Sequence, residues 1–104
     1  MTDSILKQAV EKDAIFLPEQ VLHDTNLTAS SKLIFGFVFT ISSEKGYSDI
    51  TNKGLGTLFN LTPTYVSQRI SELRKAGYIK TEIIYKKGST SIAGRHIYPT
   101  LLEV

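Results

Sequence analysis

Residues 50–79 read ITNKGLGTLFNLTPTYVSQRISELRKAGYI, and this stretch decides the fold because it contains two helix starts and a helix stop. Thr51 precedes a short helical segment, and threonine is a favourable N-cap because its hydroxyl accepts a backbone N–H of the first turn. Thr62 followed by Pro63 marks a second helix start, since proline suits the first helical position. Gly77 marks the end of that helix, because glycine adopts the left-handed conformation that often closes one.

The two predicted helices cover residues 52–59 and 63–75. In the second, Val66, Ile70 and Leu73 recur at helical spacing and predict one buried stripe. The first is short and contains two glycines, each of which costs about 1 kcal/mol relative to alanine inside a helix. We therefore expect the first helix to depend on packing of its apolar side chains.

A third helix is predicted over residues 28–43, and it is apolar on two sides. A helical wheel places Phe35 and Phe39 nearly opposite the larger apolar face, which we expect to point inward and which comprises Leu33, Ile34, Phe37, Val38 and Ile41. Either the N-terminal residues or a second copy of the chain then covers Phe35 and Phe39, which makes these two phenylalanines a candidate assembly face. The N-terminal residues are the favoured cover.

The chain divides into an N-terminal arm or short helix, residues 1–14, and a single domain, residues 15–104. After the helices, residues 78–85 predict a strand, residues 86–90 a basic hairpin tip and residues 95–98 a returning strand that Pro99 limits. Three core helices followed by a β-hairpin predict an α+β fold, the winged helix-turn-helix. In that fold the last helix enters the major groove of DNA and the hairpin, or wing, contacts the flanking backbone.

The sequence also resembles bacterial winged helix domains, through residues 50–62 and 66–79. An upstream pattern makes it similar to the N-terminal DNA-binding domain of plasmid and phage replication initiators of Gram-positive bacteria, namely Phe16-Leu17-Pro18, Val21-Leu22, Asp24, Leu27-Thr28 and Lys32 to Gly36. The resemblance covers residues 15–98 and implies a role in replication initiation or, since no second domain follows, in a small transcriptional regulator. The sequence departs from the family pattern at Gly54 and Gly56.

Charge is unevenly distributed along a chain whose net charge is +2. The first 60 residues contain five basic and seven acidic residues, whereas the last 44 contain seven basic and three acidic residues. A positive C-terminal part suits an anionic partner, and double-stranded DNA fits it best.

The residues expected to contact DNA belong to the two helix starts, the second helix and the wing. Gln68 can pair with adenine and Arg69 with guanine or a phosphate, while Tyr65 either contacts DNA or covers the edge of the core. The remaining candidates are polar or basic and are expected to bind the DNA backbone: Thr51, Asn52, Lys53, Thr62, Thr64, Ser67, Lys86, Lys87 and Arg95.

Other classes of function lack the residues they need. The chain has no cysteine and two histidines, so no metal site, cofactor site or nucleophile with its base is expected, and we predict a protein that is not an enzyme. No apolar stretch is long enough to cross a bilayer, and a cytoplasmic protein associated with the bacterial nucleoid or a plasmid is expected. The alternative function is a winged helix that recruits a replication or transcription protein, or a second copy of itself, and binds DNA weakly.

Overall fold

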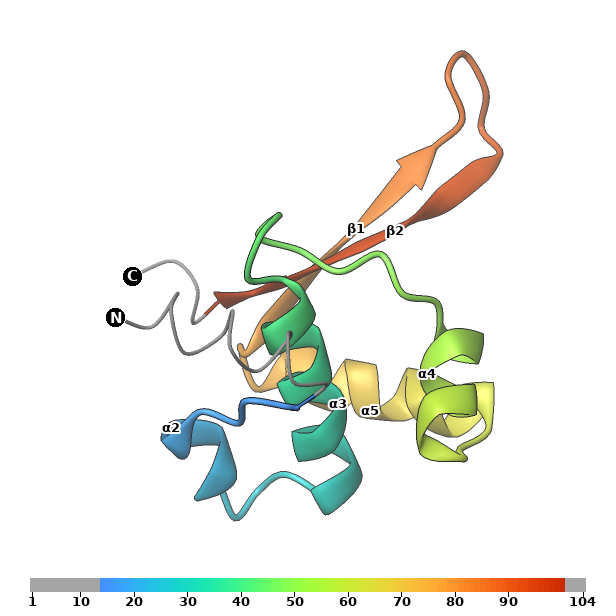
Figure 1. Cartoon of the computed structure of the whole chain (residues 1–104). Helices are drawn as coiled ribbons and strands as arrows, with labels where there is room; N and C mark the ends of the chain where they lie inside the picture. The colour runs from blue at the N-terminus through green and yellow to red at the C-terminus, as the bar shows by residue number, and fades with distance from the viewer. Residues whose placement is uncertain (1–13, 101–104) are drawn as a thin grey trace.

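The computed structural model of the chain describes residues 14–100, so all but the last residue of the expected N-terminal arm lies outside the described residues. The described elements are α2 (Glu19–Leu22), α3 (Ala29–Ile41), α4 (Asn52–Phe59), α5 (Pro63–Lys75), β1 (Ile79–Tyr85) and β2 (Ile92–Pro99). Figure 1 shows the helices gathered at one end and a long β-hairpin projecting from them. The fold is the expected α+β winged helix, with α2 as a further short helix.

Three threonines start the three longer helices, as their positions predict. The Thr28 hydroxyl accepts the Ser31 N–H at 3.2 Å, the Thr51 hydroxyl accepts the Gly54 N–H at 2.9 Å, and the Thr62 hydroxyl accepts the Tyr65 N–H at 3.1 Å. Each bond satisfies one of the backbone donors that a helix start leaves without a partner inside the helix. The starts of α3, α4 and α5 are therefore set by local chemistry.

The turn between α4 and α5 requires a glycine in α4. The Leu61 N–H donates to the Gly56 carbonyl at 2.8 Å, and Asn60 adopts a left-handed conformation with φ of 58°. A Cβ atom on Gly56 would overlap the Leu61 carbonyl oxygen, which is backbone and has little freedom to move. The glycine that weakens α4 is thus what lets the chain double back closely onto it.

The inward face of α3 differs from the predicted one. Ile34, Phe35 and Phe39 are at most 2% exposed, whereas Leu33 and Ile41 are 48% and 43% exposed. The expectation that Leu33 and Ile41 point inward is therefore wrong, although Ile34 and Val38 are buried as expected. The two bulky phenylalanines of the opposite side face the core in their place.

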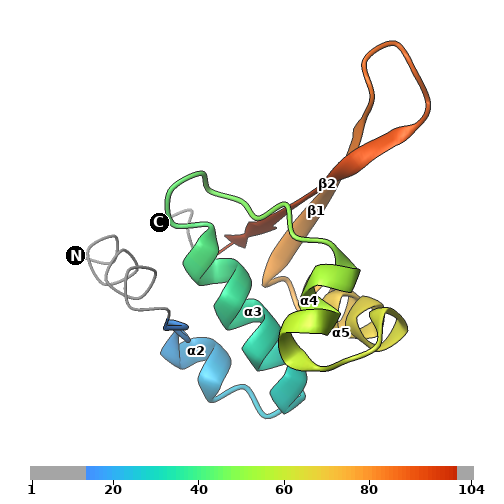
Figure 2. The same cartoon turned by 45° about the vertical axis from the view of Figure 1, so that its right-hand side comes forward.

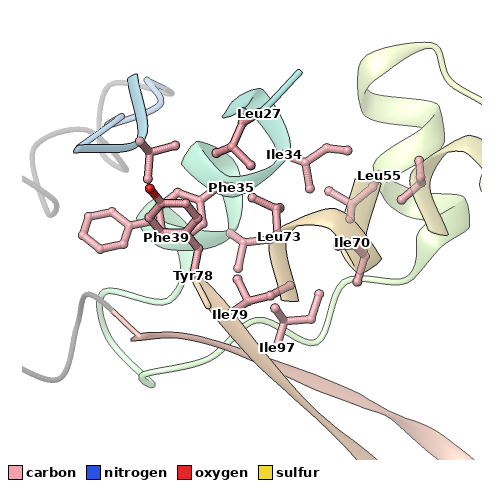
Figure 3. Packing of buried hydrophobic residues seen from close by; sticks show 13 residues of the cluster. Leu27, Ile34, Phe35, Phe39, Leu55, Ile70, Leu73, Tyr78, Ile79 and Ile97 are labelled. Carbon is pink, nitrogen blue, oxygen red and sulfur yellow. The ribbon is translucent and has the colours of Figure 1, made fainter. Parts of the chain in front are cut away.

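Phe35 and Phe39 are consequently not an exposed assembly face, and that prediction is corrected. The Phe39 ring stacks on Phe16 with 5.9 Å between centroids, and the Phe35 ring meets the edge of Tyr78 at 5.7 Å. Figure 3 shows both phenylalanines inside the cluster of buried side chains, beside Leu73 and Tyr78. Described residues of the same chain therefore pack against both rings.

The hairpin pairs β1 and β2 in antiparallel register, from Ile79 opposite Pro99 to Tyr85 opposite Ile92. β2 begins at Ile92, earlier than the predicted start at Arg95, and Pro99 lies at its end as predicted. Ser48, in the segment before α4, exchanges two backbone hydrogen bonds with Ile97 at 2.9 and 2.8 Å. Figures 1 and 2 show that the distal half of the hairpin extends well past the helices.

A hydrogen bond joins the segment after α2 to the start of the hairpin. The Tyr78 hydroxyl donates to Asp24 Oδ2 at 2.6 Å. This bond, together with the Asn26 N–H donated to the same carboxylate, lowers the pKa of Asp24 below its ordinary value of 3.8.

The described helices include none that is long and apolar enough to cross a membrane.

Candidate nucleic-acid interface

The outward face of α5 carries short polar side chains. Val66, Ile70 and Leu73 are buried as predicted, which turns the opposite side of the helix to solvent. Thr64, Ser67 and Gln68 are exposed on that side, in the first half of the helix. A helix that presents such groups from its N-terminal half has the form that inserts into a major groove and contacts base edges.

Tyr65 and Arg69 lie half-buried at the edge of this outward face. The sequence left Tyr65 open between DNA contact and cover of the core edge, and the DNA contact expected of Arg69 stays a prediction. Arg69 Nη1 lies 2.9 Å from Glu72 Oε2 and donates to the Thr28 hydroxyl at 3.3 Å. Its guanidinium also sits over the Tyr65 ring, 4.8 Å from the centroid, and its side chain is 18% exposed.

Arg69 instead joins α5 to the start of α3. The same Glu72 carboxylate accepts the Thr28 N–H at 2.9 Å, so one acidic residue holds both the arginine and the helix cap. Arg69 and Glu72 thus form an ion pair within α5, at a spacing of three residues. Both members of this mostly covered pair also bond Thr28, and the pair therefore positions the two helices relative to each other, while the buried Nε of Arg69 has no hydrogen-bond partner among the described residues.

The start of α4 presents one free cation. Thr51 uses its hydroxyl to cap the helix, and Asn52 Oδ1 accepts a bond from Arg95 at 2.8 Å. Lys53 is exposed at the first turn, where the helix end adds partial positive charge. Of the three candidates here, Lys53 is therefore the side chain with a free charged group, while Thr51 and Asn52 hold the local structure.

Arg95 bridges the wing and the start of α4. Its Nη1 donates to Asn52 Oδ1 at 2.8 Å and its Nη2 donates to the Ile50 carbonyl at 2.9 Å. The side chain is half-buried, and burial followed by the charge of Arg74 lowers the pKa of Arg95. An arginine nevertheless stays protonated in proteins. Arg95 thus brings a positive charge to the junction of β2 and α4 and fixes the hairpin there.

The wing tip is basic, as predicted. Lys86 and Lys87 are exposed between the two strands, and the Lys86 N–H donates to the Ser91 carbonyl at 2.8 Å across the turn. Gly88 adopts φ of 70°, which lets the chain reverse. Two lysines therefore project at the end of the hairpin, far from the helices (Figure 2).

Sequence reasoning did not select Arg74, which lies in the last turn of α5. Arg74 Nη1 donates to the Thr81 hydroxyl at 3.3 Å and Nη2 donates to the Ser71 hydroxyl at 3.2 Å. Its place beside β1 follows only from the folded hairpin. The excess of basic residues after position 60 was the one signal that could have included it.

Most basic side chains of the candidate interface have no acidic partner. In the part of the chain that the structure describes, Arg69 with Glu72 is the one ion pair that a lysine or arginine makes. The free cations near α4, α5 and the wing are Lys53, Arg74, Lys75, Lys80, Lys86, Lys87 and Arg95. Within residues 14–100 no group of three or more acidic or histidine side chains is arranged to hold a metal ion.

Comparison with protein families agrees with this geometry. Residues 47–80 match the family described as winged helix-turn-helix DNA-binding, and this range spans α4, the turn, α5 and the first residues of β1. The chain is thus similar to DNA-binding winged helices in the part that holds the outward face of α5, which supports DNA binding as its general function. Comparisons with curated proteins and with solved structures find no match.

Proposed function

We propose that this protein binds double-stranded DNA in a sequence-specific manner, with α5 in the major groove. The observation that carries the proposal is the outward face of α5, where Gln68, Thr64 and Ser67 are exposed while the buried stripe holds the helix rigidly. A glutamine amide can pair with adenine through both its ends, and hydroxyls bind phosphates or base edges. Two neighbouring elements then bind the backbone, α4 through Lys53 and the wing through Lys86 and Lys87.

In this proposal the candidate residues of α4 and α5 have different roles. Gln68 reads a base, and Thr64 and Ser67 bind nearby. Arg69 and Tyr65 hold α5 against α3, because Arg69 Nη1 and the Tyr65 hydroxyl are already bonded inside the chain. Thr51, Thr62 and Asn52 shape the two helix starts that face the backbone.

The test is a selection from random DNA duplexes at about 50 and 200 mM salt, with sequencing of the bound fraction. We expect one enriched motif and binding that weakens steeply with salt. Binding that is salt-sensitive but enriches no motif would replace direct readout with backbone binding alone. No binding at either salt concentration would overturn the proposal and favour the protein-recruiting alternative.

The enriched motif also tests whether the protein acts in replication initiation or in transcriptional regulation. A replication initiator of the kind that the sequence resembles is expected to bind a site inside a plasmid or phage origin, whereas a regulator is expected to bind beside a promoter. An inverted repeat in the motif would mean that two copies of the chain bind together, because a symmetric dimer reads symmetric half-sites.

A further inference from the structure

Two arginines meet where α4, α5 and the hairpin join, and neither has an acidic partner. Arg74 reaches β1 from the last turn of α5, and Arg95 reaches the start of α4 from β2. Neither arginine lies within 4.0 Å of a carboxylate among residues 14–100. Glu82, the nearest acidic residue in sequence to Thr81, bonds the Tyr98 hydroxyl at 3.1 Å.

The strand register places the two arginines close together. Thr81, which holds Arg74, pairs with Ile97, and Ile83 pairs with Arg95. Thr81 and Arg95 are therefore diagonal neighbours on one face of the hairpin, a relation that separates Cα atoms by about 7–8 Å. This is the face that packs against the helices, since Ile97 is fully buried on it. Burial and, after it, the charge of Arg74 lower the pKa of Arg95, which agrees with the two guanidinium groups lying near each other.

The two positively charged guanidinium groups are bonded only to neutral acceptors, so an anion could neutralise them. Each guanidinium has five N–H donors in a planar fork, and the bonds described here occupy two of them on each arginine. Their acceptors are hydroxyl, amide and carbonyl oxygens, none of which neutralises a positive charge. An oxyanion with several acceptor oxygens would bond the free donors and remove the repulsion.

We propose that Arg74 and Arg95, together with the hydroxyls of Ser71 and Thr81, bind one phosphate of the DNA backbone between α5 and the wing. This inference rests on the proposed DNA binding and adds a backbone contact separate from the wing tip. Arg95 is already fixed by Asn52 and Ile50, so the phosphate meets at least one guanidinium that is held in place before binding. Arg74 completes the site from the exposed side.

The decisive variant is Arg74→Ala, because Arg74 is exposed and its loss leaves no buried group without a partner. Lys45→Ala is the matched control, since it removes the same charge from the turn after α3, which Figure 2 shows at the end of α3 away from α4 and α5. We expect Arg74→Ala to weaken binding about tenfold for the selected and for random duplexes alike. The slope of log affinity against log salt should become shallower by about one, and Lys45→Ala should change neither.

A second measurement locates the phosphate by comparing wild type with Arg74→Ala. Duplexes of the selected sequence are made with one phosphate at a time replaced by an uncharged methylphosphonate. We expect one position at which this replacement weakens binding by the wild-type chain clearly more than binding by Arg74→Ala, which keeps Arg95 at the site.

Three results would distinguish a wrong phosphate site from a wrong proposal of DNA binding. If wild type binds the motif and Arg74→Ala behaves like Lys45→Ala, the phosphate site is wrong and the proposed function stands. The same conclusion follows if no methylphosphonate position separates wild type from the variant. If wild type binds no duplex, both proposals fail together.

Discussion

Gln68 is the side chain on α5 whose chemistry suits base recognition. It is exposed on the outward face, one residue before Arg69, which is bonded inside the chain. Gln68→Ala should weaken binding to the selected site by about 1–3 kcal/mol and relax the preference at one base pair. The measurement compares the selected duplex with single-base variants of it. An unchanged preference at every position would show that another residue reads the sequence.

The hydrogen bond between Tyr78 and Asp24 predicts how the free energy of unfolding depends on pH. The folded pKa of Asp24 is lowered by the bond from Tyr78, so this contact stabilises the fold above about pH 3.8 and its contribution is lost as the pH falls through the folded pKa. Tyr78→Phe should therefore reduce the free energy of unfolding near pH 6 and have little effect well below pH 3.8. Urea unfolding at several pH values measures this.

Tyr85→Phe provides the matched control, because it makes the same chemical change at a tyrosine that is 57% exposed. It should leave the free energy of unfolding unchanged at every pH. If Tyr78→Phe showed a constant difference from wild type across the pH range, the Asp24 contact would not be its cause.

Among the elements, α4 combines a sequence of low helix propensity with a close turn at its C-terminal end. Alanine favours helix by about 1 kcal/mol over glycine, so Gly56→Ala would stabilise an isolated helix. In the folded chain the added methyl group would overlap the Leu61 carbonyl. We expect a net loss of about 1–3 kcal/mol in the free energy of unfolding, as for other overpacked sites.

Gly54→Ala tests whether the turn, and not helix propensity, determines that result. Its added Cβ would meet mainly the Ile50 side chain, at 3.0 Å, and a side chain can move aside. Gly54→Ala should therefore destabilise less than Gly56→Ala in the same urea titration. Equal losses at both positions would contradict the close-approach explanation.

The elements show what can be predicted without coordinates. The starts of α3, α4 and α5 follow from neighbouring residues, because a threonine cap acts within one turn, and Gly77 ends α5 in the same local way. The inward face of α3 was predicted wrongly because apolar residues surround that helix. Which side is buried depends on partners distant in the sequence, such as Phe16 and Tyr78.

At the candidate interface, too, only the features set by neighbouring residues could be predicted. The buried stripe of α5 identified Gln68 as outward, since helical spacing alone decides it. Arg69 could not be assigned in this way, because its long side chain bends to Thr28 at the start of another helix. Arg74 and Arg95 become neighbours only when the strands pair, so no local pattern joins them.

On the scale of the whole molecule, the basic groups are spread along a hairpin and two helices, and the wing tip is the most distant of them. Replacing both Lys86 and Lys87 by alanine should weaken binding to every duplex and make the salt slope shallower by about two. The preferred bases should not change, because these lysines contact phosphates. A changed motif would instead mean that the wing reads base edges.

Hydrogen bonds fasten the wing to the rest of the molecule at three places, through Arg95 with the start of α4, through Ser48 with Ile97 and through Arg74 with Thr81. We expect a hairpin held in this way to keep a constant distance from α5. In the proposed complex the span from α5 to the wing tip would then correspond to a set number of base pairs, so that the protein would act as a gauge of distance along DNA. Two sites with identical bases would be distinguished by how far the helical path of the flanking backbone carries a phosphate toward the wing.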